Sequence, residues 1–324
     1  MKFLDSLLLF VFSASYGWGD LIEPSAWQKQ VPQDKGDLVS IQNQLQTLLP
    51  DSKQALVAIE SNDGAGSGVI VSADGLVLTA AHVIGTSDKR MTIRLPDGRT
   101  AKAVSLGGSE ISDAGMLKIL DEGPWPHAKM ANSGKSKIGD WCFGLGHPGG
   151  FDEARGIVVR IGRIIQKSEE TMQTDSRLLG GDSGGPLFDF EGKVIAIHSR
   201  ISQQADQNYH VPIESFHANW SYFQNHQLLT IDNIEEGGFL GVACEESEEG
   251  LLIINVVQDS AADIGGLMRG DILLRVDDQI IKNRERLTIS ISSKKPGEEV
   301  KLEFKRDGSI ATLKVNLGSR IATE

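Results

Sequence analysis

Short apolar runs separated by Gly, Asp and Asn turns dominate the chain between residues 55 and 201. Many short strands at regular spacing, without helices between them, predict an all-β barrel or a pair of barrels. The runs are ALVAIE, SGVIVS, LVLTAA, MTIRL, AGMLKIL, WCFGLG, GIVVRIGRII, PLFDF and KVIAIHS. We therefore expect a mainly β domain over residues 51–230.

Helical spacing appears on both sides of this β-rich region. In the N-terminal segment, residues 20–50, four apolar positions recur every three or four residues and predict one amphipathic helix: Leu38, Ile41, Leu45 and Leu48. Asp37 is the expected N-cap of this helix and Pro50 its stop. On the other side, a second helix is predicted by an aromatic stripe: Phe216, Trp220 and Phe223.

A second change of pattern follows an acidic linker at residues 231–236. Beyond it, RERLTISIS predicts a helix that places Leu287 and Ile291 at i, i+4. Five further runs predict strands: GFLGVACEE, GLLIINVV, DILLRVDDQII, VKLEFKR and ATLKVNL. Residues 237–319 are therefore expected to form a small α+β domain.

The first residues have the layout of a secretory signal peptide. Lys2 precedes an apolar run, Leu7 to Phe12, which is too short to span a bilayer, and small residues follow the run. We assign residues 1–19 to this signal and expect export. An uncleaved N-terminal anchor is the alternative.

The charge of the chain limits the kinds of partner that it can bind, and its cysteine content indicates the cellular compartment. The formal charge of −12 argues against nucleic acid as a partner, because nucleic-acid binding requires a basic face. The two cysteines, Cys142 and Cys244, fall in different predicted domains. So few cysteines in an exported chain fit a bacterial periplasm better than a disulfide-stapled extracellular scaffold.

Three residues far apart in the sequence form a candidate catalytic set. Ser183 lies in the glycine-rich stretch LLGGDSGGPLFD, His82 follows an apolar run in VLTAAHVI, and Asp113 begins SDAGMLKI. A nucleophilic serine needs a base within reach and an acid to orient that base, and the order His, Asp, Ser is the chymotrypsin order. Taken singly, each residue also fits an ordinary turn or core role. His147 in GHPGGF lacks partners at metal-ligand spacing, so we interpret that stretch as a turn beside the site.

Taken together, these motifs resemble the trypsin-like serine proteases of the HtrA (Deg) family, which carry a C-terminal PDZ domain. The resemblance rests on GSGVIVSADGLVLTAAHVI, DAGMLKI, QTDSRLLGGDSGGPLFDFEGKVIAIHS and YHVPI, and, in the second domain, on GFLGV and DSAADIGGLMRGDILLRVDDQII. It implies a chymotrypsin-like double β-barrel without cofactor or metal. His82 would be the general base, Asp113 its orienting acid, and the N–H groups of Gly181 and Ser183 the oxyanion hole.

The resemblance leaves the substrate preference open. It implies a specificity pocket formed from five residues: Arg177, Leu178, Leu179, His198 and His210. Leu178 fits the small aliphatic preference of the family, whereas His198 occupies the position of a pocket histidine in glutamate-specific bacterial relatives. Asp182 departs from the usual family asparagine and needs a partner of its own or solvent.

In the second domain, the resemblance implies that a peptide C-terminus binds as an added strand. The expected carboxylate-binding loop and first strand position are Phe239, Leu240, Gly241 and Val242. Leu287 and Ile291 would form the opposite wall, although core packing explains either of them equally well.

We therefore expect an exported serine endopeptidase that acts on unfolded or misfolded envelope proteins in the periplasm, with peptide C-termini as PDZ ligands. Relatives are trimers, so a homotrimer is the oligomer that the resemblance implies. Two alternatives stay open: a PDZ-bearing chaperone or scaffold with a resting protease domain, and a processing protease with an acidic cleavage preference.

Overall fold

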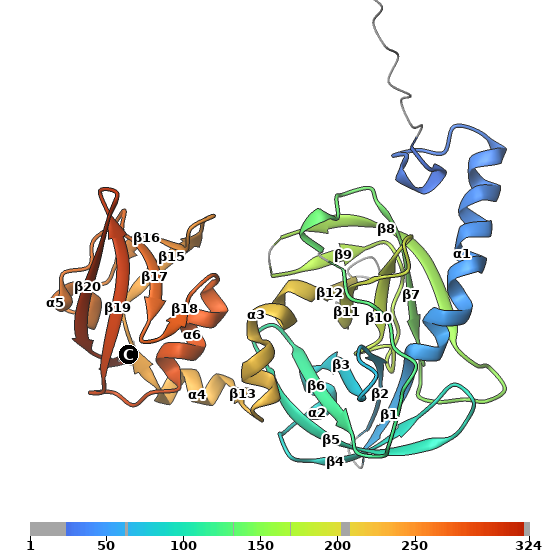
Figure 1. The fold of residues 1–324 in the computed structure, drawn as a ribbon, viewed down its shortest axis with the longest axis horizontal. Coiled ribbons are helices and arrows are strands. Elements are labelled where there is room, and N and C mark those ends of the chain that lie inside the picture. The colour runs from blue at the N-terminus through green and yellow to red at the C-terminus, as the bar shows by residue number, and fades with distance from the viewer. Residues whose placement is uncertain (1–23, 62–63, 132, 169, 202–207, 321–324) are drawn as a thin grey trace, which may run out of the picture.

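The computed structural model describes residues 24–61, 64–131, 133–168, 170–201 and 208–320. Two β-barrels lie side by side, and a smaller β-rich domain is joined to them through short helices (Figure 1). The predicted mainly β class with two barrels and a small C-terminal domain is confirmed. The predicted signal peptide, residues 1–19, lies outside the described residues.

Six antiparallel strands form the first barrel: β1 (Leu56–Ser61), β2 (Gly64–Ile70), β3 (Leu76–Ala80), β4 (Arg90–Arg94), β5 (Thr100–Ser109) and β6 (Ala114–Ile119). They follow the order β5-β4-β1-β2-β3-β6, and a further pairing of β5 with β6 closes the barrel. The short helix α2 (Ala81–Ile84) follows β3 directly, and β13 (Leu228–Leu229) pairs in parallel with β5. Fully buried side chains such as Val57, Ile59 and Ile93 fill the interior.

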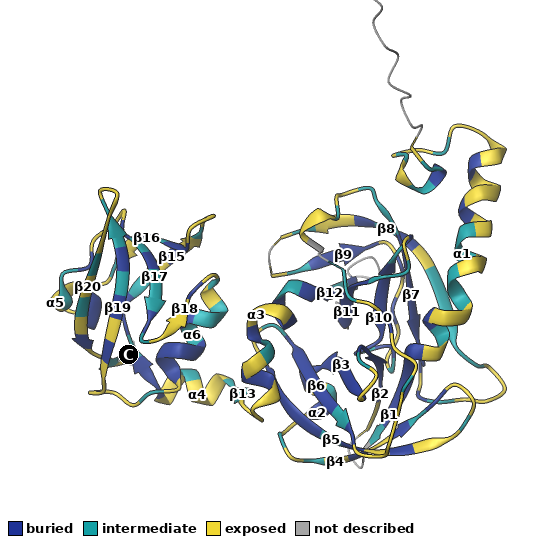
Figure 2. Ribbon diagram, in the orientation of Figure 1, coloured by how far each residue is buried: buried dark blue, intermediate teal, exposed yellow. Residues whose placement is uncertain are grey.

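The second barrel is closed in the order β10-β11-β12-β9-β8-β7. Its strands are β7 (Trp141–Gly146), β8 (Val158–Lys167), β9 (Met172–Thr174), β10 (Pro186–Asp189), β11 (Val194–Ile201) and β12 (Asn208–Pro212). Phe143 and Phe188 from the paired strands β7 and β10 stack with ring centroids 5.0 Å apart. Figure 2 shows that buried residues concentrate on the strands of both barrels.

The N-terminal helix α1 (Lys35–Ala55) is longer than expected. Its N-cap is Asp34, whose side chain accepts the Asp37 N–H, so the predicted cap at Asp37 is wrong. Pro50 lies inside the helix instead of ending it. A proline in this position removes one helical hydrogen bond, and packing of Leu48 and Leu49 against the barrel core offsets that loss. A single 3-10 turn, η1 (Ala26–Gln28), precedes α1, and another, η2 (Ser133–Lys135), precedes β7.

Two helices lead from the barrels to the C-terminal domain. They are α3 (Ile213–Gln224), which buries the predicted stripe residues Phe216 and Phe223, and α4 (Ile231–Glu236). The predicted acidic linker, residues 231–236, coincides with α4 and is helical. The Thr230 side chain caps this helix by accepting the Asn233 N–H.

The C-terminal domain is a sheet in the order β15-β16-β17-β19-β20 with α5 (Ala261–Gly265) and α6 (Arg284–Ser292) packed on it. Its strands are β14 (Gly238–Phe239), β15 (Val242–Glu246), β16 (Leu251–Val256), β17 (Ile272–Val276), β18 (Gln279–Ile280), β19 (Glu299–Arg306), β20 (Ser309–Asn316) and β21 (Gly318–Ser319). Strand β15 lies at the edge of this sheet, so its outer side is open to a further strand.

Both cysteines are buried and unpaired. Cys142 lies on β7 and Cys244 on β15, in separate domains. Burial raises the pKa of the Cys244 thiol to about 11 and that of Cys142 higher still. No helix in the described ranges is long and apolar enough to cross a membrane.

Candidate active site

The barrel pairing brings His82 and Asp113 together. Strand β3 pairs with β6 so that Ala80 lies opposite Ala114. His82 lies in α2, two residues after Ala80, and Asp113 directly precedes Ala114, the first residue of β6. Register therefore explains how residues 31 positions apart meet. Asp113 has a positive φ of 59°, and its carbonyl accepts the Ala81 N–H, which fixes the turn before β6.

The His82 ring is held by the Asp113 carboxylate. Nδ1 lies 2.9 Å from Oδ1 and 3.0 Å from Oδ2, and the His82 backbone N–H also donates to Oδ1 at 3.1 Å. The hydrogen bond with Asp113 raises the pKa of His82, although burial partly opposes this. Burial favours a higher pKa for Asp113, but the hydrogen bonds from His82 and Ser199 outweigh it and lower that pKa. The carboxylate therefore stays charged, and Nδ1 carries the proton that faces it.

Ser199 is a fourth member of this cluster that the sequence analysis did not identify. Its hydroxyl donates to Asp113 Oδ2 at 2.5 Å, and its carbonyl oxygen accepts the Ser183 hydroxyl at 3.1 Å. Among the described hydrogen bonds, Ser183 Oγ thus donates to Ser199 rather than to His82. Ser199 is the last residue of the predicted run KVIAIHS, but only the closed barrel shows that β11 passes behind both residues.

The loop before Ser183 presents two backbone N–H groups. The Gly180 carbonyl accepts the Gly149 N–H at 2.6 Å. Because the C=O and N–H of a trans peptide point in opposite directions, the Gly181 N–H faces away from Gly149. Neither this N–H nor that of Ser183 donates to an acceptor among the described residues. Both N–H groups are therefore unpaired within the part of the chain that the structure describes.

Close packing explains the glycines around the nucleophile. Gly181 has φ of +94°, and a Cβ there would lie 2.5 Å from the His147 carbonyl oxygen and 2.6 Å from the Gly149 nitrogen. The GHPGGF stretch is therefore a turn that packs directly against the oxyanion loop. Ser67, which is fully buried, donates to the Gly181 carbonyl at 2.8 Å and so supports the same loop from β2.

Asp182, between the two oxyanion donors, is completely buried and paired with Arg160 of β8. Arg160 Nη2 lies 2.8 Å from Oδ2, and Nη1 lies 3.1 Å from Oδ1. The departure from the family asparagine thus has an internal partner, which the sequence alone did not reveal.

The cavity beside Ser183 contains two of the five predicted pocket residues. It has a volume of about 360 Å³ and is lined by His82, Leu178, Leu179, Gly180, Ser183, Ser199 and Arg200. The Leu178 N–H donates to Asn208 Oδ1 at 2.8 Å, which fixes this wall to β12. Arg177 is exposed and does not line this cavity.

His198 and His210, the other predicted pocket residues, are buried away from this cavity and face each other. Their Nδ1 atoms are 2.9 Å apart, and His210 Nε2 lies 2.8 Å from Thr174 Oγ1. Burial lowers the pKa of His210 to about 3 and holds that of His198 well below its usual range. The pair is therefore neutral and belongs to the core of the second barrel, because β11 and β12 place both rings inside it.

We expect this pair to make the fold acid-sensitive. A histidine with a lowered folded-state pKa contributes stability that is complete above its unfolded pKa of 6.5 and declines as pH falls from 6.5 toward the folded value, about 3 for His210. Each such residue changes the free energy of unfolding by about 1.4 kcal/mol per pH unit within that window. We would measure the free energy of unfolding by urea denaturation at several pH values between 7.5 and 4.5. This free energy should fall less steeply with decreasing pH in His210→Gln than in wild type. His127→Gln, which replaces an exposed histidine, should keep the wild-type dependence of the free energy of unfolding on pH. The same dependence in both variants would contradict the prediction.

In the C-terminal domain, the predicted peptide-binding residues lie along β14, β15 and α6. Phe239 and Val242 are partly exposed, whereas Leu240 is buried, and Gly241 has φ of +86° in the turn before β15. Leu287 and Ile291 on α6 are 8% and 6% exposed and pack in the domain core. These two side chains therefore pack in the domain core, and β15 is the edge strand of the sheet beside them.

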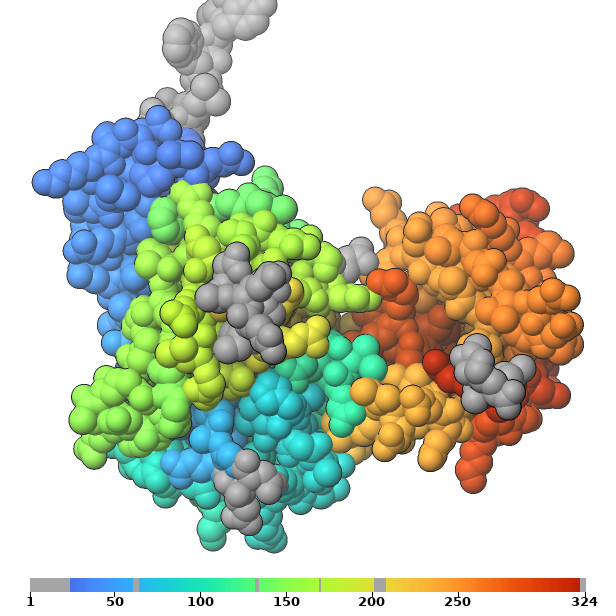
Figure 3. Space-filling model, turned by 180° about the vertical axis from the view of Figure 1, so that it is seen from behind, coloured from blue at the N-terminus to red at the C-terminus, as the bar shows by residue number. Residues whose placement is uncertain are grey.

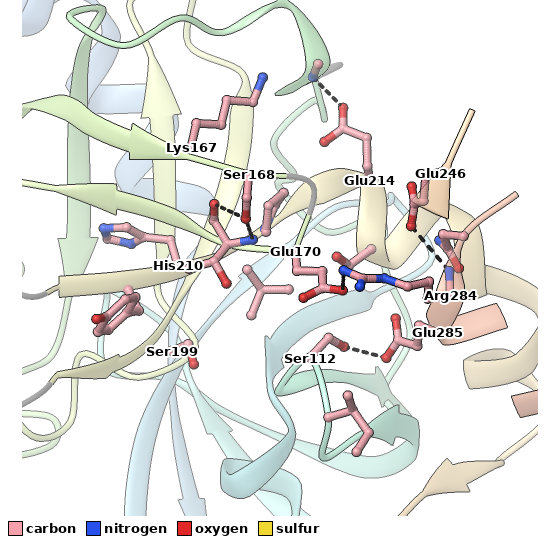
Figure 4. Close-up of a pocket in the computed structure, with 18 of the residues that line it drawn as sticks. Ser112, Lys167, Ser168, Glu170, Ser199, His210, Glu214, Glu246, Arg284 and Glu285 are labelled. Carbon is pink, nitrogen blue, oxygen red and sulfur yellow. Dashed lines mark hydrogen bonds and ion pairs between the residues drawn. The ribbon is translucent and has the colours of Figure 1, made fainter. Parts of the chain in front are cut away.

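Helix α6 also contacts the first barrel. Figure 3 shows a hollow between the barrels and the C-terminal domain, and Figure 4 shows its lining residues, which enclose about 850 Å³. Glu285 of α6 accepts the Ser112 hydroxyl at 2.8 Å and the Asn219 amide at 2.7 Å, and Arg284 pairs with Glu170 at 2.6 Å. Burial raises the pKa of Glu285. The domain contact thus reaches the residue directly before Asp113.

Comparisons with known proteins agree with this architecture. The family model described as trypsin-like peptidase domain matches residues 66–197, and the one described as PDZ domain matches residues 238–317. Two barrels carry a serine, a histidine and an aspartate at their junction, and a PDZ domain follows them. This combination defines the class of the chain, a trypsin-like peptidase domain joined to a PDZ domain.

Relatives and solved structures give the family. A protein named probable periplasmic serine endoprotease DegP-like from Ectopseudomonas mendocina is 33% identical over 274 residues, which are 78% of this chain and 56% of the relative. A protein of the same name from Halomonas elongata is 30% identical over 279 residues, 80% of this chain and 57% of the relative. The structure of the HtrA-type protease AlgW with tripeptide superposes with a TM-score of 0.59 at 25% identity and covers 85% of this chain and 97% of that one. The chain therefore carries a trypsin-like peptidase domain followed by a PDZ domain, and it is similar to the HtrA-type serine proteases. It spans little more than half the length of the DegP-like relatives.

Proposed function

We propose that this protein is a serine endopeptidase that cleaves peptide bonds through an acyl-enzyme at Ser183. The observation that carries the proposal is the meeting of Ser183, two free oxyanion donors and a His82 ring fixed by Asp113 at the barrel junction. Nucleophilic catalysis by serine needs all three of these components.

In the proposed reaction, the Ser183 hydroxyl first turns from the Ser199 carbonyl toward His82. Nε2 of His82 takes the hydroxyl proton while Oγ forms a bond to the substrate carbonyl carbon. The N–H groups of Gly181 and Ser183 stabilise the negative charge on the carbonyl oxygen. His82 then gives its proton to the leaving amine, and water hydrolyses the acyl-enzyme by the same route. Asp113 keeps Nδ1 protonated throughout.

The leucine-lined cavity supports an aliphatic side chain before the cleaved bond. Leu178 and Leu179 contribute apolar surface there, while His198 and His210, the basis for an acidic preference, lie in the barrel core. Arg200 also lines this cavity, and its guanidinium carbon lies 5.8 Å from the centre of the Tyr209 ring.

The substrates we propose are unfolded or misfolded proteins of the cell envelope, with peptide C-termini bound as a strand beside β15. The open edge of β15 and the turn at Phe239, Leu240 and Gly241 support this binding mode. The relatives named periplasmic support an exported protein. We also propose a homotrimer, by analogy with the family.

One observation favours a second candidate, a resting scaffold. Ser183 Oγ is bonded to the Ser199 carbonyl, so the hydrogen bond to His82 that activates the nucleophile is not made in this state. A protein that stayed in this arrangement would bind peptides without cleaving them.

The test is to incubate the full chain with unfolded casein, with and without a fluorophosphonate probe, and to map labelled residues and product termini by mass spectrometry. We expect the probe to label Ser183 and to block cleavage, and the cuts to follow aliphatic residues. Cuts after Glu or Asp would favour the processing protease. Binding of casein without cleavage or labelling, even with added C-terminal peptides, would favour the scaffold.

We expect activity to rise with pH through a value above 6.5. His82 must be neutral to accept the Ser183 proton, and its hydrogen bond with Asp113 raises its pKa from the usual 6.5. Rates of peptide hydrolysis between pH 5 and 9, at substrate concentrations well below KM, report this titration. An activity that is already complete below pH 6 would contradict it.

A further inference from the structure

The pair formed by Arg160 and Asp182 lies directly behind the oxyanion loop. The Asp182 carboxylate has no solvent exposure, and the Arg160 side chain is 13% exposed. Arg160 comes from β8, where its backbone lies opposite Gly144 of β7. Gly146, two residues further on β7, leaves the space for Asp182, because a Cβ there would lie 2.3 Å from Oδ1. The barrel wall is thus shaped around this carboxylate.

Asp182 closes the loop with both its backbone and its side chain. Its N–H donates to the Leu179 carbonyl at 3.0 Å, and its Oδ2 accepts the Leu179 N–H at 2.8 Å. These two bonds set the turn from Leu179 to Asp182, which contains the peptide between Gly180 and Gly181. The orientation of that peptide decides whether the Gly181 N–H faces the substrate.

The charge on Asp182 is stable only while a cation accompanies it. Burial raises the pKa of Asp182, and the Leu179 N–H and Arg160 both oppose the rise. An ionised carboxylate without a partner at this depth would be costly, and the loop could avoid that cost by moving the side chain toward water. Such a movement would carry Gly181 and Ser183, the neighbours of Asp182, with it.

We propose that Arg160 is a positioning residue, which holds the oxyanion loop in its catalytic arrangement by pairing with Asp182. This inference rests on the proposed function, because the loop is useful only to an enzyme that forms an oxyanion. In this chain, an arginine of the second barrel supplies the counter-charge to Asp182 from within the same folded domain.

The experiment compares Arg160→Gln with the double variant Arg160→Gln/Asp182→Asn. We expect kcat of the single variant to fall about 100-fold or more, the loss typical of a misplaced oxyanion donor, with little change in KM. The double variant should recover to within about tenfold of wild type, because the neutral amide oxygen at position 182 still accepts the Leu179 N–H and no unpaired charge remains. Fluorophosphonate labelling of Ser183 should follow the same order.

Arg163→Gln is the matched control, because Arg163 lies on the same strand but stacks on Trp141 and donates to the carbonyl oxygens of Gln30 and Gly139 instead of to Asp182. It should keep wild-type kcat. Near-wild-type kcat in Arg160→Gln, or a double variant as impaired as the single one, would overturn the proposal.

Crystal structures of the two Arg160 variants separate this inference from the proposed function. We expect Arg160→Gln to lose the bond between the Gly149 N–H and the Gly180 carbonyl, and the double variant to keep it. This readout holds whether or not the wild-type protein cleaves peptides. An unchanged loop in Arg160→Gln would overturn the inference alone, whereas an inactive, unlabelled wild type would count against the endopeptidase alone.

Discussion

Replacing Ser183 by alanine is expected to lower kcat for peptide hydrolysis by about 10⁶-fold, the loss seen when a serine nucleophile is removed from a comparable triad. The variant keeps the oxyanion donors and the cavity, so substrate binding should change little. Its fold should also persist, because the lost bond to the Ser199 carbonyl is a single, partly buried one. Initial rates on a fluorogenic peptide and a binding isotherm for the same peptide would separate kcat from binding.

Ser176→Ala is the matched control for this prediction. Ser176 is a buried serine in the segment before the nucleophile, and its hydroxyl has no hydrogen-bond partner among the described residues. Removing it should leave activity within about twofold of wild type, since an unpaired hydroxyl contributes little to stability. A Ser183→Ala variant that still cleaves casein would show that another residue is the nucleophile.

Asp113→Asn is expected to lower kcat by about 10⁴-fold, the loss associated with the wrong histidine tautomer. An asparagine amide turned toward Nδ1 donates a hydrogen bond and so favours the tautomer in which Nε2 carries the proton. That nitrogen then cannot accept the proton of Ser183. The Ser199 hydroxyl, which donates to Oδ2, can still donate to an amide oxygen in that place, whereas the His82 N–H, which donates to Oδ1, then loses its acceptor.

The measurement is kcat and KM at pH 8, together with a crystal structure of the variant. Asp97→Asn is the control, because Asp97 is an exposed carboxylate that pairs with Arg99 and does not line the cavity beside Ser183. Activity within tenfold of wild type in Asp113→Asn would mean that His82 is oriented by other groups.

Local patterns predict much of this fold. The helix at Arg284–Ser292 matches its predicted range to the residue, since it begins with an Asn283 cap and carries the expected i, i+4 pair. Strand β5 escaped prediction because its sequence, TAKAVSLGGS, is weakly apolar and carries two glycines. Those glycines are needed for packing: a Cβ at Gly107 would lie 2.2 Å from the Gln227 carbonyl oxygen. Pro50 inside α1 shows that tertiary packing can override a local helix stop.

Some residues of the candidate site could be predicted from local sequence motifs, and others could not. His82, Asp113 and Ser183 stand in motifs that a single sequence displays. Ser199 and Arg160 lie in ordinary strand sequences, and only barrel closure and strand register bring them to Asp113 and Asp182. His198 and His210 were expected in the specificity pocket. The structure places both rings in the barrel core, because β11 and β12 direct these side chains inward.

The two buried thiols have a practical consequence for experiments on this protein. With Cys142 and Cys244 enclosed in separate domains and their pKa values raised, neither forms a thiolate readily at neutral pH. A cysteine introduced at an exposed position would therefore react first with a maleimide reagent in the otherwise unaltered chain. One such label on the first barrel and a second on the outer face of the C-terminal domain would report the distance between the domains in solution, without removing either natural cysteine.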